Sequence, residues 1–335
     1  MKTVLVTGAA SFIGRCLIDA QLEAGNTVHA IVSSGSPIGR KLKMRDVKVV
    51  YGDIHDYATV QKVTADVDIV YHCDPTITDW TTEKKFQDTI ISGTRNICRA
   101  AAEADVEHFI FISTHDVFGY RKKKVIDENS PTEKWQEPYP DKKIKAGEIC
   151  KMFHKEQKLP LTTVYPCWVY GEYDYSFTTG IANAILKKRM FYWRKNALIW
   201  PTYIRNLIDL LMYIPENEKS IGNDYLIHDG TPITVRELCK KISTYLELPV
   251  IRKRTPYLFA LLMANLLESV WRFFQIKHRP ILTTYVVKKL SSYREYSIKK
   301  VKNELKWQPK ISSEKGLSKT MNWMKTVDRS KLKPK

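Results

Sequence analysis

The stretch Thr7-Gly8-Ala9-Ala10-Ser11-Phe12-Ile13-Gly14 decides the fold of this chain. It follows an apolar run at residues 2–6 and opens a helical pattern over residues 12–22. A glycine in such a turn lets the backbone approach a pyrophosphate, and the amino terminus of the following helix faces the negative charge. Its position after a strand and inside a strand–helix–strand unit therefore predicts a dinucleotide-binding turn, although Ser11 replaces the central glycine.

Strand-like and helical segments alternate downstream of this turn. Apolar runs predict strands at residues 28–32, 47–51, 69–71, 109–112 and 162–165, and helical patterns lie near residues 60–64, 84–102 and 139–154. Strands joined through helices by short loops predict an α/β fold, a Rossmann-type doubly wound parallel sheet with helices on both faces. Ligands of such a sheet bind at the carboxyl ends of its strands.

The pattern changes after Gly171 to longer helical stretches with aromatic clusters. We therefore predict a dinucleotide-binding domain over residues 1–171 and a smaller, mostly helical substrate lobe over residues 172–330. Some segments of this lobe are expected to return to the first domain. Residues 331–335 form a basic tail that we expect to be frayed.

The composition narrows the class of partner. The 54 Lys and Arg exceed the 36 Asp and Glu, which gives a net charge of +18, while 44% hydrophobic residues are typical of a globular chain. No helix-turn-helix, zinc-finger or RNP-type signature is present, so no specific nucleic-acid partner is expected. We interpret the basic runs as solvated faces, with an anionic partner as the alternative.

Cysteine usage and the apolar runs bear on location. The six cysteines are scattered, without a CxxC pair or zinc-ligand spacing, which predicts no metal site and a reducing cytoplasm. The amino-terminal run is interpreted as a buried strand instead of a signal peptide. The longest apolar stretch, residues 257–267, is too short to span a bilayer.

These motifs resemble the extended short-chain dehydrogenase/reductase family, the NAD-dependent epimerase/dehydratase superfamily. TGAASFIG matches its fingerprint TGxxGFIG except at Ser11. Other matching pieces are Gly52-Asp53-Ile54, Gly93-Thr94-Arg95-Asn96, Phe111-Ile112-Ser113-Thr114-His115-Asp116-Val117-Phe118-Gly119, Asp127-Glu128-Asn129-Ser130-Pro131, Pro138-Tyr139 with Lys143, and Leu305-Lys306-Trp307-Gln308-Pro309. Within the family, the chain is similar to the 3β-hydroxysteroid dehydrogenase-like branch, because both place a long apolar helix in the last lobe.

The resemblance implies a nicotinamide cofactor. The implied contacts are Gly8, Ser11, Phe12, Ile13, Gly14, Ser33, Arg40, Asp53, Ile54, Lys143 and Pro166. An NAD-specific site usually places an acidic residue on the ribose 2′-hydroxyl at the end of the second strand. Residues 30–35 hold none, and the basic residues Arg40, Lys41 and Lys43 follow, so we predict a preference for NADP(H) over NAD(H).

Four Tyr-x-x-x-Lys pairs occur in the chain: Tyr120/Lys124, Tyr139/Lys143, Tyr285/Lys289 and Tyr296/Lys300. This spacing places both side chains on one helical face, where the ammonium favours the phenolate. Only Tyr139 follows a proline at a predicted helix start, downstream of a strand end that carries Thr114. We interpret the other three as surface pairs. The resemblance implies Tyr139 as proton donor or acceptor, Lys143 as ribose ligand and Thr114 as the residue that orients the substrate oxygen.

Several positions depart from the family pattern: Ser11, Ile90 in place of asparagine, Asp74-Pro75 in place of a small pair, and Tyr165 in place of arginine. They leave open a catalytically degenerate nucleotide-binding protein. A nucleotide-sugar epimerase or dehydratase of the same superfamily is the other alternative. The resemblance favours an oxidoreductase that transfers a hydride to or from a small, apolar, sterol-like or lipid-like substrate, and it implies a homodimer.

The apolar segment 256–274 has two interpretations. We favour a buried helix of the substrate lobe. The alternative is a helix that lies flat on an anionic membrane, with the basic residues Arg272 and Lys277 beside its apolar side. The apolar residues concerned are Leu258, Leu261, Leu262, Leu266, Leu267, Trp271 and Phe274.

Overall fold

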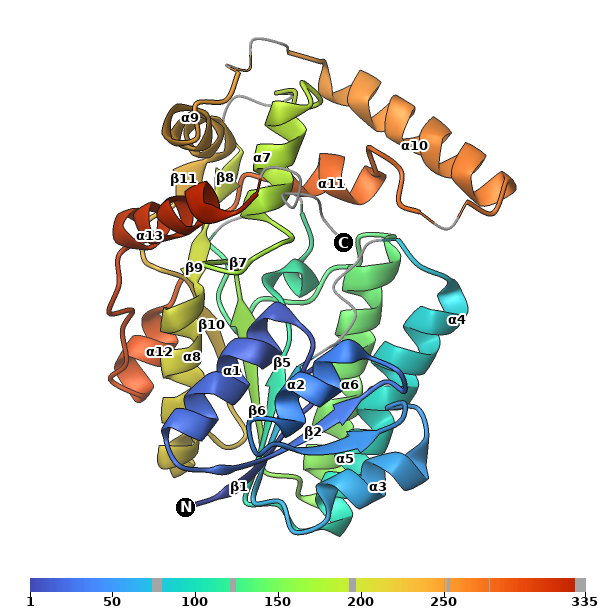
Figure 1. The fold of residues 1–335 in the computed structure, drawn as a ribbon, viewed down its shortest axis with the longest axis vertical. Helices are drawn as coiled ribbons and strands as arrows, with labels where there is room; N and C mark the ends of the chain where they lie inside the picture. The colour runs from blue at the N-terminus through green and yellow to red at the C-terminus, as the bar shows by residue number, and fades with distance from the viewer. Residues whose placement is uncertain are drawn as a thin grey trace.

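A seven-stranded parallel sheet lies at the centre of the fold (Figure 1). The computed structural model describes residues 1–73, 80–120, 125–192, 197–249, 251, 254–276 and 278–328. The strands are β1 (Thr3–Val6), β2 (Thr27–Val32), β3 (Lys48–Tyr51), β4 (Ile69–Cys73), β5 (His108–Ile112), β6 (Leu161–Pro166) and β10 (Asp224–Ile227). Their order in the sheet is β10-β6-β5-β4-β1-β2-β3. From β1 the chain adds strands toward one edge as far as β3, and from β4 it adds them toward the other edge, so the order switches between β1 and β4. The predicted doubly wound fold is confirmed.

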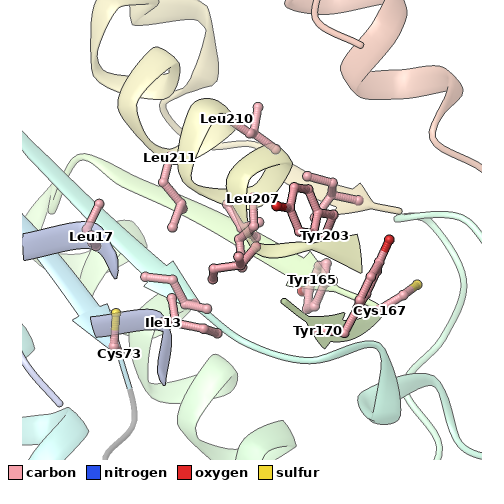
Figure 2. Packing of buried hydrophobic residues seen from close by; sticks show 14 of the residues in the cluster. Ile13, Leu17, Cys73, Tyr165, Cys167, Tyr170, Tyr203, Leu207, Leu210 and Leu211 are labelled. Atoms are coloured by element: carbon pink, nitrogen blue, oxygen red, sulfur yellow. The ribbon is translucent and has the colours of Figure 1, made fainter. Parts of the chain in front are cut away.

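Helices cover both faces of this sheet. They are α1 (Phe12–Glu23), α2 (Pro37–Lys43), α3 (Tyr57–Thr64), α4 (Glu83–Phe86), the π-helical η1 (Gln87–Ser92), α5 (Gly93–Glu103), α6 (Pro138–Gln157) and α8 (Ile204–Tyr213). Side chains alternate between the faces along a strand. Val4 and Val6 accordingly belong to a hydrophobic cluster with α1 and α8, and Leu5 belongs to a cluster with α5 and α6. Figure 2 shows the first cluster, where Ile13 and Leu17 of α1 lie near Leu207 and Leu211 of α8.

Part of the chain after Gly171 forms helices and short strands at one end of the sheet. Its further helices are α7 (Thr178–Leu186), α9 (Val235–Tyr245), α10 (Tyr257–Phe273), α11 (Thr284–Lys289), α12 (Lys299–Glu304) and α13 (Ser313–Thr326), with η3 (Ile214–Glu216) and η4 (Glu218–Ser220). The short strands β8 (Leu198–Ile199), β9 (Pro201–Tyr203) and β11 (Ile233–Thr234) escaped the sequence analysis, as did β7 (Trp168–Tyr170) just before them. Because β10 pairs with β6, part of this region returns to the main sheet. The domain division at residue 171 stays a prediction.

Buried polar groups connect the two parts of the chain. The Asp229 carboxylate accepts hydrogen bonds from the Tyr203 amide at 2.9 Å, the Tyr170 hydroxyl at 3.0 Å and the Asn206 amide at 2.8 Å. Burial nevertheless raises the pKa of Asp229 to about 6. Five buried histidines also lie in or beside the sheet: His29, His72, His108, His115 and His228. Their ring nitrogens bond to backbone carbonyls or threonine hydroxyls.

The α10 helix departs from the favoured expectation of a buried helix. Of its residues, only Ala260 and Ala264 are buried, whereas Leu258 is 75% exposed and Phe273 is 81% exposed. In Figure 1, α10 lies at the periphery of the molecule beyond α11. Within the described residues, every helix is too short or too polar to cross a membrane.

Candidate active site

The predicted phosphate-binding turn joins β1 to α1. Gly8 adopts a positive φ of 61°, which glycine tolerates without strain. A Cβ on Gly14 would lie 2.3 Å from the Gly8 carbonyl oxygen, so position 14 has no room for a side chain. Ser11 has an extended backbone conformation, and its hydroxyl accepts the Gly14 amide at 3.0 Å and caps α1. The missing central glycine is therefore replaced by a residue that stabilises the helix start.

A cleft opens at the carboxyl ends of β1, β2 and β3. The predicted cofactor residues Gly8, Ser33, Asp53 and Ile54 all line it. Sequence reasoning missed Ser36, His55 and Thr89, which also line the cleft and belong to none of the quoted motifs. Of the other predicted contacts, Ser11, Phe12, Ile13 and Gly14 form the start of α1 beside the cleft, whereas Arg40 is exposed on α2 and does not line it.

Two sequence motifs meet below this cleft. The Asn96 side-chain amide donates to the Ile54 carbonyl at 3.2 Å and to the His55 carbonyl at 2.8 Å. The GTRN motif at the start of α5 therefore holds the turn after β3 that carries Asp53. The cleft suits a dinucleotide, because Gly8, Ala9 and Ala10 leave the amino end of α1 open to a phosphate.

A buried hydrogen-bond chain supports the strand ends. Thr7 donates its hydroxyl proton to the Cys73 carbonyl at 2.8 Å, and its oxygen lies 2.9 Å from Nδ1 of His72. His72 must therefore donate from Nδ1, so its Nε2 accepts from the Thr94 hydroxyl at 3.0 Å. Burial, and to a lesser degree the nearby Lys143 ammonium, lowers the pKa of His72 to about 3. The ring therefore stays neutral near pH 7.

The predicted catalytic residues lie on β5 and α6. Lys143 is 1% exposed, and its ammonium donates to the Ile112 carbonyl at 3.0 Å and lies 4.5 Å above the Phe111 ring. Tyr139 lies one turn earlier on α6, in its first turn after Pro138. The buried Lys143 thus reaches the end of β5, two residues before Thr114.

Thr114 follows β5 and is 8% exposed. Its hydroxyl oxygen accepts the Asp116 amide at 3.2 Å and caps the 3-10 turn η2 (His115–Phe118). Since this bond occupies the oxygen as an acceptor, the hydroxyl proton of Thr114 remains available for another acceptor. His115 lies just beyond, with its ring nitrogen Nδ1 3.2 Å from the carbonyl of Pro166, another predicted contact.

The interpretation of Tyr285/Lys289 as a surface pair is wrong. The Tyr285 hydroxyl and the Lys289 ammonium each lie 2.7 Å from Oδ2 of Asp116, and they lie 2.8 Å from each other. The Tyr285 ring stands edge-on to Tyr139, with 6.4 Å between ring centroids. Nothing local in the sequence signals this contact, since 169 residues separate Asp116 from Tyr285.

Asp116 itself is 1% exposed. Burial alone would raise its pKa, but Lys289, His115 and Tyr285 outweigh burial and hold the pKa below its ordinary value. Asp116 therefore stays charged, and α11 supplies its counterion. On the same helix Lys288 bonds to Glu137 at 2.6 Å, directly before Pro138 at the start of α6.

The remaining Tyr-x-x-x-Lys pairs, and the positions that depart from the family pattern, differ in their surroundings. Tyr296 is buried and edge-on to His115, so it is not a surface residue either, while Lys300 donates to Asn223 at 2.9 Å. Ile90 is buried within η1, and the Tyr165 hydroxyl donates to Asp224 at 3.2 Å. Four residues that the sequence analysis singled out lie outside the described residues: Lys124, Asp74, Pro75 and Lys277. In the part of the chain that the structure describes, no cluster of His, Cys, Asp or Glu could hold a metal ion.

A parallel sheet with a glycine turn and a cleft at its strand ends defines a dinucleotide-binding protein. The model of the NAD dependent epimerase/dehydratase family matches residues 4–227, and the chain belongs to this family. The family assignment confirms the predicted membership of the extended short-chain dehydrogenases/reductases and an NAD(P)-dependent enzyme.

Relatives cover almost the whole chain. The 2-alkyl-3-oxoalkanoate reductase of Stenotrophomonas maltophilia is 24% identical, over 94% of this chain and 97% of the relative. A 3-beta-hydroxysteroid dehydrogenase of Mycolicibacterium neoaurum is 23% identical, over 94% of this chain and 89% of the relative. The UDP-glucose 4-epimerase structure from Thermotoga maritima aligns with a TM-score of 0.76 at 20% identity, over 96% of this chain and 98% of that chain. This last similarity concerns the fold alone.

Proposed function

We propose that the protein is an NAD(P)-dependent oxidoreductase that transfers a hydride between nicotinamide and a carbonyl or secondary alcohol of an apolar, sterol-like or lipid-like substrate. The observation that carries this proposal is the position of Lys143, buried at the end of β5 one helical turn from Tyr139. A buried ammonium beside a tyrosine favours the phenolate, which makes proton transfer easier near neutral pH.

Each proposed catalytic residue has one task. Bound nicotinamide supplies or accepts the hydride at its ring carbon C4. Thr114 directs its hydroxyl proton to the substrate oxygen, while its own oxygen accepts the Asp116 amide. Tyr139 gives a proton to that oxygen as it becomes an alkoxide, or takes one from the alcohol in the reverse direction. Lys143 would hold the ribose of a bound cofactor and tune Tyr139.

The substrate class is supported by two observations. The reductase and dehydrogenase relatives are named for 2-alkyl-3-oxoalkanoates and 3-beta-hydroxysteroids, both of which combine a carbonyl or hydroxyl with an apolar body. In addition, α11 brings residues of the carboxyl-terminal region to Tyr139, and the apolar α10 packs on α11. Turnover should therefore oxidise NAD(P)H with a panel of apolar ketones. Retained cofactor with no net absorbance change, together with conversion of a UDP-sugar, would instead identify an epimerase.

The proposal includes a preference of the protein for NADP(H) over NAD(H). Ser33 at the end of β2 lines the cleft and is exposed, and the exposed Arg40 follows on α2. We expect NADPH to bind roughly tenfold more tightly than NADH, since one charge-assisted hydrogen bond contributes about 1.5 kcal/mol. Arg40→Ala should bring the two dissociation constants together when both are measured by calorimetry. Arg45→Ala removes the same charge from a residue paired with Asp19 and serves as the control. Tighter binding of NADH by the unaltered protein would contradict the preference.

The same proposal includes a homodimer, a cytoplasmic location and peripheral association with anionic membranes. A membrane is where a sterol-like or lipid-like substrate dissolves, so an enzyme for such a substrate gains from residence there. The net charge of +18 favours anionic lipid.

A further inference from the structure

In α10 the large apolar side chains are exposed and the small ones are buried, which is the reverse of a helix packed into a core. The outer face of α10 comprises Leu258, Phe259, Leu262, Leu266, Val270, Phe273 and Phe274, which are between 37% and 81% exposed. The inner face has the small residues Ala260 and Ala264, which are buried in a minor cluster with Val287 of α11. A helix of a soluble protein normally turns its large apolar side chains inward.

Most of the exposed apolar residues lie along one side of α10. Leu258, Leu262 and Leu266 follow one another at four-residue spacing, so they lie on the same side of the helix. Phe273 continues this line, and Ile281, which is 62% exposed, follows α10 in sequence. Contiguous apolar patches of this kind mark interaction surfaces, whereas isolated exposed leucines do not.

The described charged residues of this segment are mostly basic. Arg254, Arg272 and Arg279 are cations, and Glu268 is the one carboxylate among the described residues of 251–279. Glu268 turns away from the outer face and accepts the Thr284 amide at 2.6 Å and the Thr284 hydroxyl at 2.9 Å. Arg272 has a side chain that is 64% exposed, and Arg279 is exposed just beyond the helix. Within the described residues of this segment, the surface therefore combines aromatic and aliphatic groups with arginines, and the carboxylate of Glu268, 3.9 Å from Arg272, is only 12% exposed.

We infer that the outer face of α10 docks on the surface of an anionic lipid bilayer, with its apolar side chains among the acyl chains and its arginines at the headgroups. This chemistry matches an interfacial helix. A second copy of the chain suits the surface less well, because two such faces would bring their basic flanks together. Each Lys or Arg near an anionic membrane instead adds to binding.

The docking face is joined to the proposed active site by α11. The inner face of α10 packs on α11, and Glu268 bonds to Thr284 at the start of α11. From α11, Tyr285 and Lys289 reach Asp116 beside Thr114, and Lys288 reaches Glu137 before Tyr139. Docking would thus place the catalytic edge near the bilayer, where an apolar substrate is dissolved. This last step rests on the proposed hydride transfer, whereas the docking, which assigns the proposed membrane association to one face, does not depend on that reaction.

Co-sedimentation with vesicles tests the docking. We expect the protein to pellet with vesicles of phosphatidylcholine and phosphatidylserine at low salt, and not with phosphatidylcholine alone. The triple variant Leu258→Ser/Leu262→Ser/Phe273→Ser should bind at least tenfold more weakly. Its thermal unfolding midpoint and cofactor affinity should stay unchanged, because these side chains are already exposed. Met44→Ser, at a residue that is 85% exposed after α2, is the matched control and should bind as the unaltered protein does.

Three results would overturn the inference. The first is equal binding of the triple variant and the unaltered protein to the anionic vesicles, and the second is no binding by either. The third is a concentration-dependent dimer in analytical ultracentrifugation that the triple variant abolishes, which would assign the face to a second copy. Failure to turn over any apolar ketone would refute the proposed function and leave the vesicle result standing, so the two failures are distinguishable.

Discussion

The pairs Tyr139/Lys143 on α6 and Tyr285/Lys289 on α11 share one spacing and differ in everything around them. Lys143 is 1% exposed and donates to a backbone carbonyl, that of Ile112. The Lys289 side chain is 17% exposed and bonds to a carboxylate, that of Asp116. The comparison teaches that four-residue spacing decides only which helical face two side chains share. The neighbouring elements decide what the pair does.

The partner of each lysine separates the two roles. Lys143 contacts the neutral carbonyl of Ile112 and shares a helical face with Tyr139, so its ammonium is placed to act on a phenolate or on a ribose hydroxyl. The carboxylate of Asp116 neutralises Lys289, and Asp116 also accepts the Tyr285 hydroxyl. We therefore assign proton transfer to the first pair and the attachment of α11 to the second.

The largest expected effect that separates the pairs is on turnover. Tyr139→Phe should lower kcat by about 10²–10⁴-fold, because the transferable proton is lost while the ring remains. Tyr285→Phe is the matched variant, and it should stay within about tenfold of the unaltered protein. Steady-state oxidation of NADPH with an apolar ketone measures both, and calorimetry should give unchanged cofactor affinity for both.

The opposite ranking would reverse the assignment. If Tyr285→Phe abolished turnover and Tyr139→Phe did not, the α11 pair would carry the proton. Tyr120→Phe is a second control, at a residue whose ring packs on Trp135, and it should be silent.

A smaller effect, on stability, should distinguish the lysine of the second pair. Lys289→Met leaves Asp116 charged and buried without its counterion, which should lower the free energy of unfolding by about 3–5 kcal/mol. Adding Asp116→Asn should restore much of this loss, since the uncompensated charge is then absent. Urea unfolding followed by circular dichroism measures both variants. If Lys289→Met alone were as stable as the unaltered protein, the ion pair between Lys289 and Asp116 would contribute little to the free energy of unfolding.

Sequence reasoning predicted the sheet because its signals are local. The glycine turn, the apolar runs and the helical patterns lie within a few residues of each other, and Gly8, Ser33, Asp53 and Ile54 come together in one cleft as expected. Contacts between distant segments carried no such signal. The bonds from α11 to Asp116, and the short strands of two or three residues after Gly171, depend on tertiary packing. The outward orientation of α10 could not be predicted either, because an apolar helix has the same composition whether it faces a core or a membrane.

The five buried histidines make the fold sensitive to acid. Burial lowers the pKa of four of them to about 3 or about 4, and it lowers that of His29 as well. An unfolded chain would bind a proton at each histidine below about pH 6.5, whereas the folded chain does not. Stability contributed by these rings is therefore complete above pH 6.5 and is lost as the pH falls toward 4. Asp229 has a pKa raised to about 6, so the folded chain binds a proton there before the unfolded chain does as the pH falls. This single proton stabilises the fold and partly offsets the effect of the histidines. Urea unfolding at several pH values should show a free energy of unfolding that declines steeply below pH 6.5.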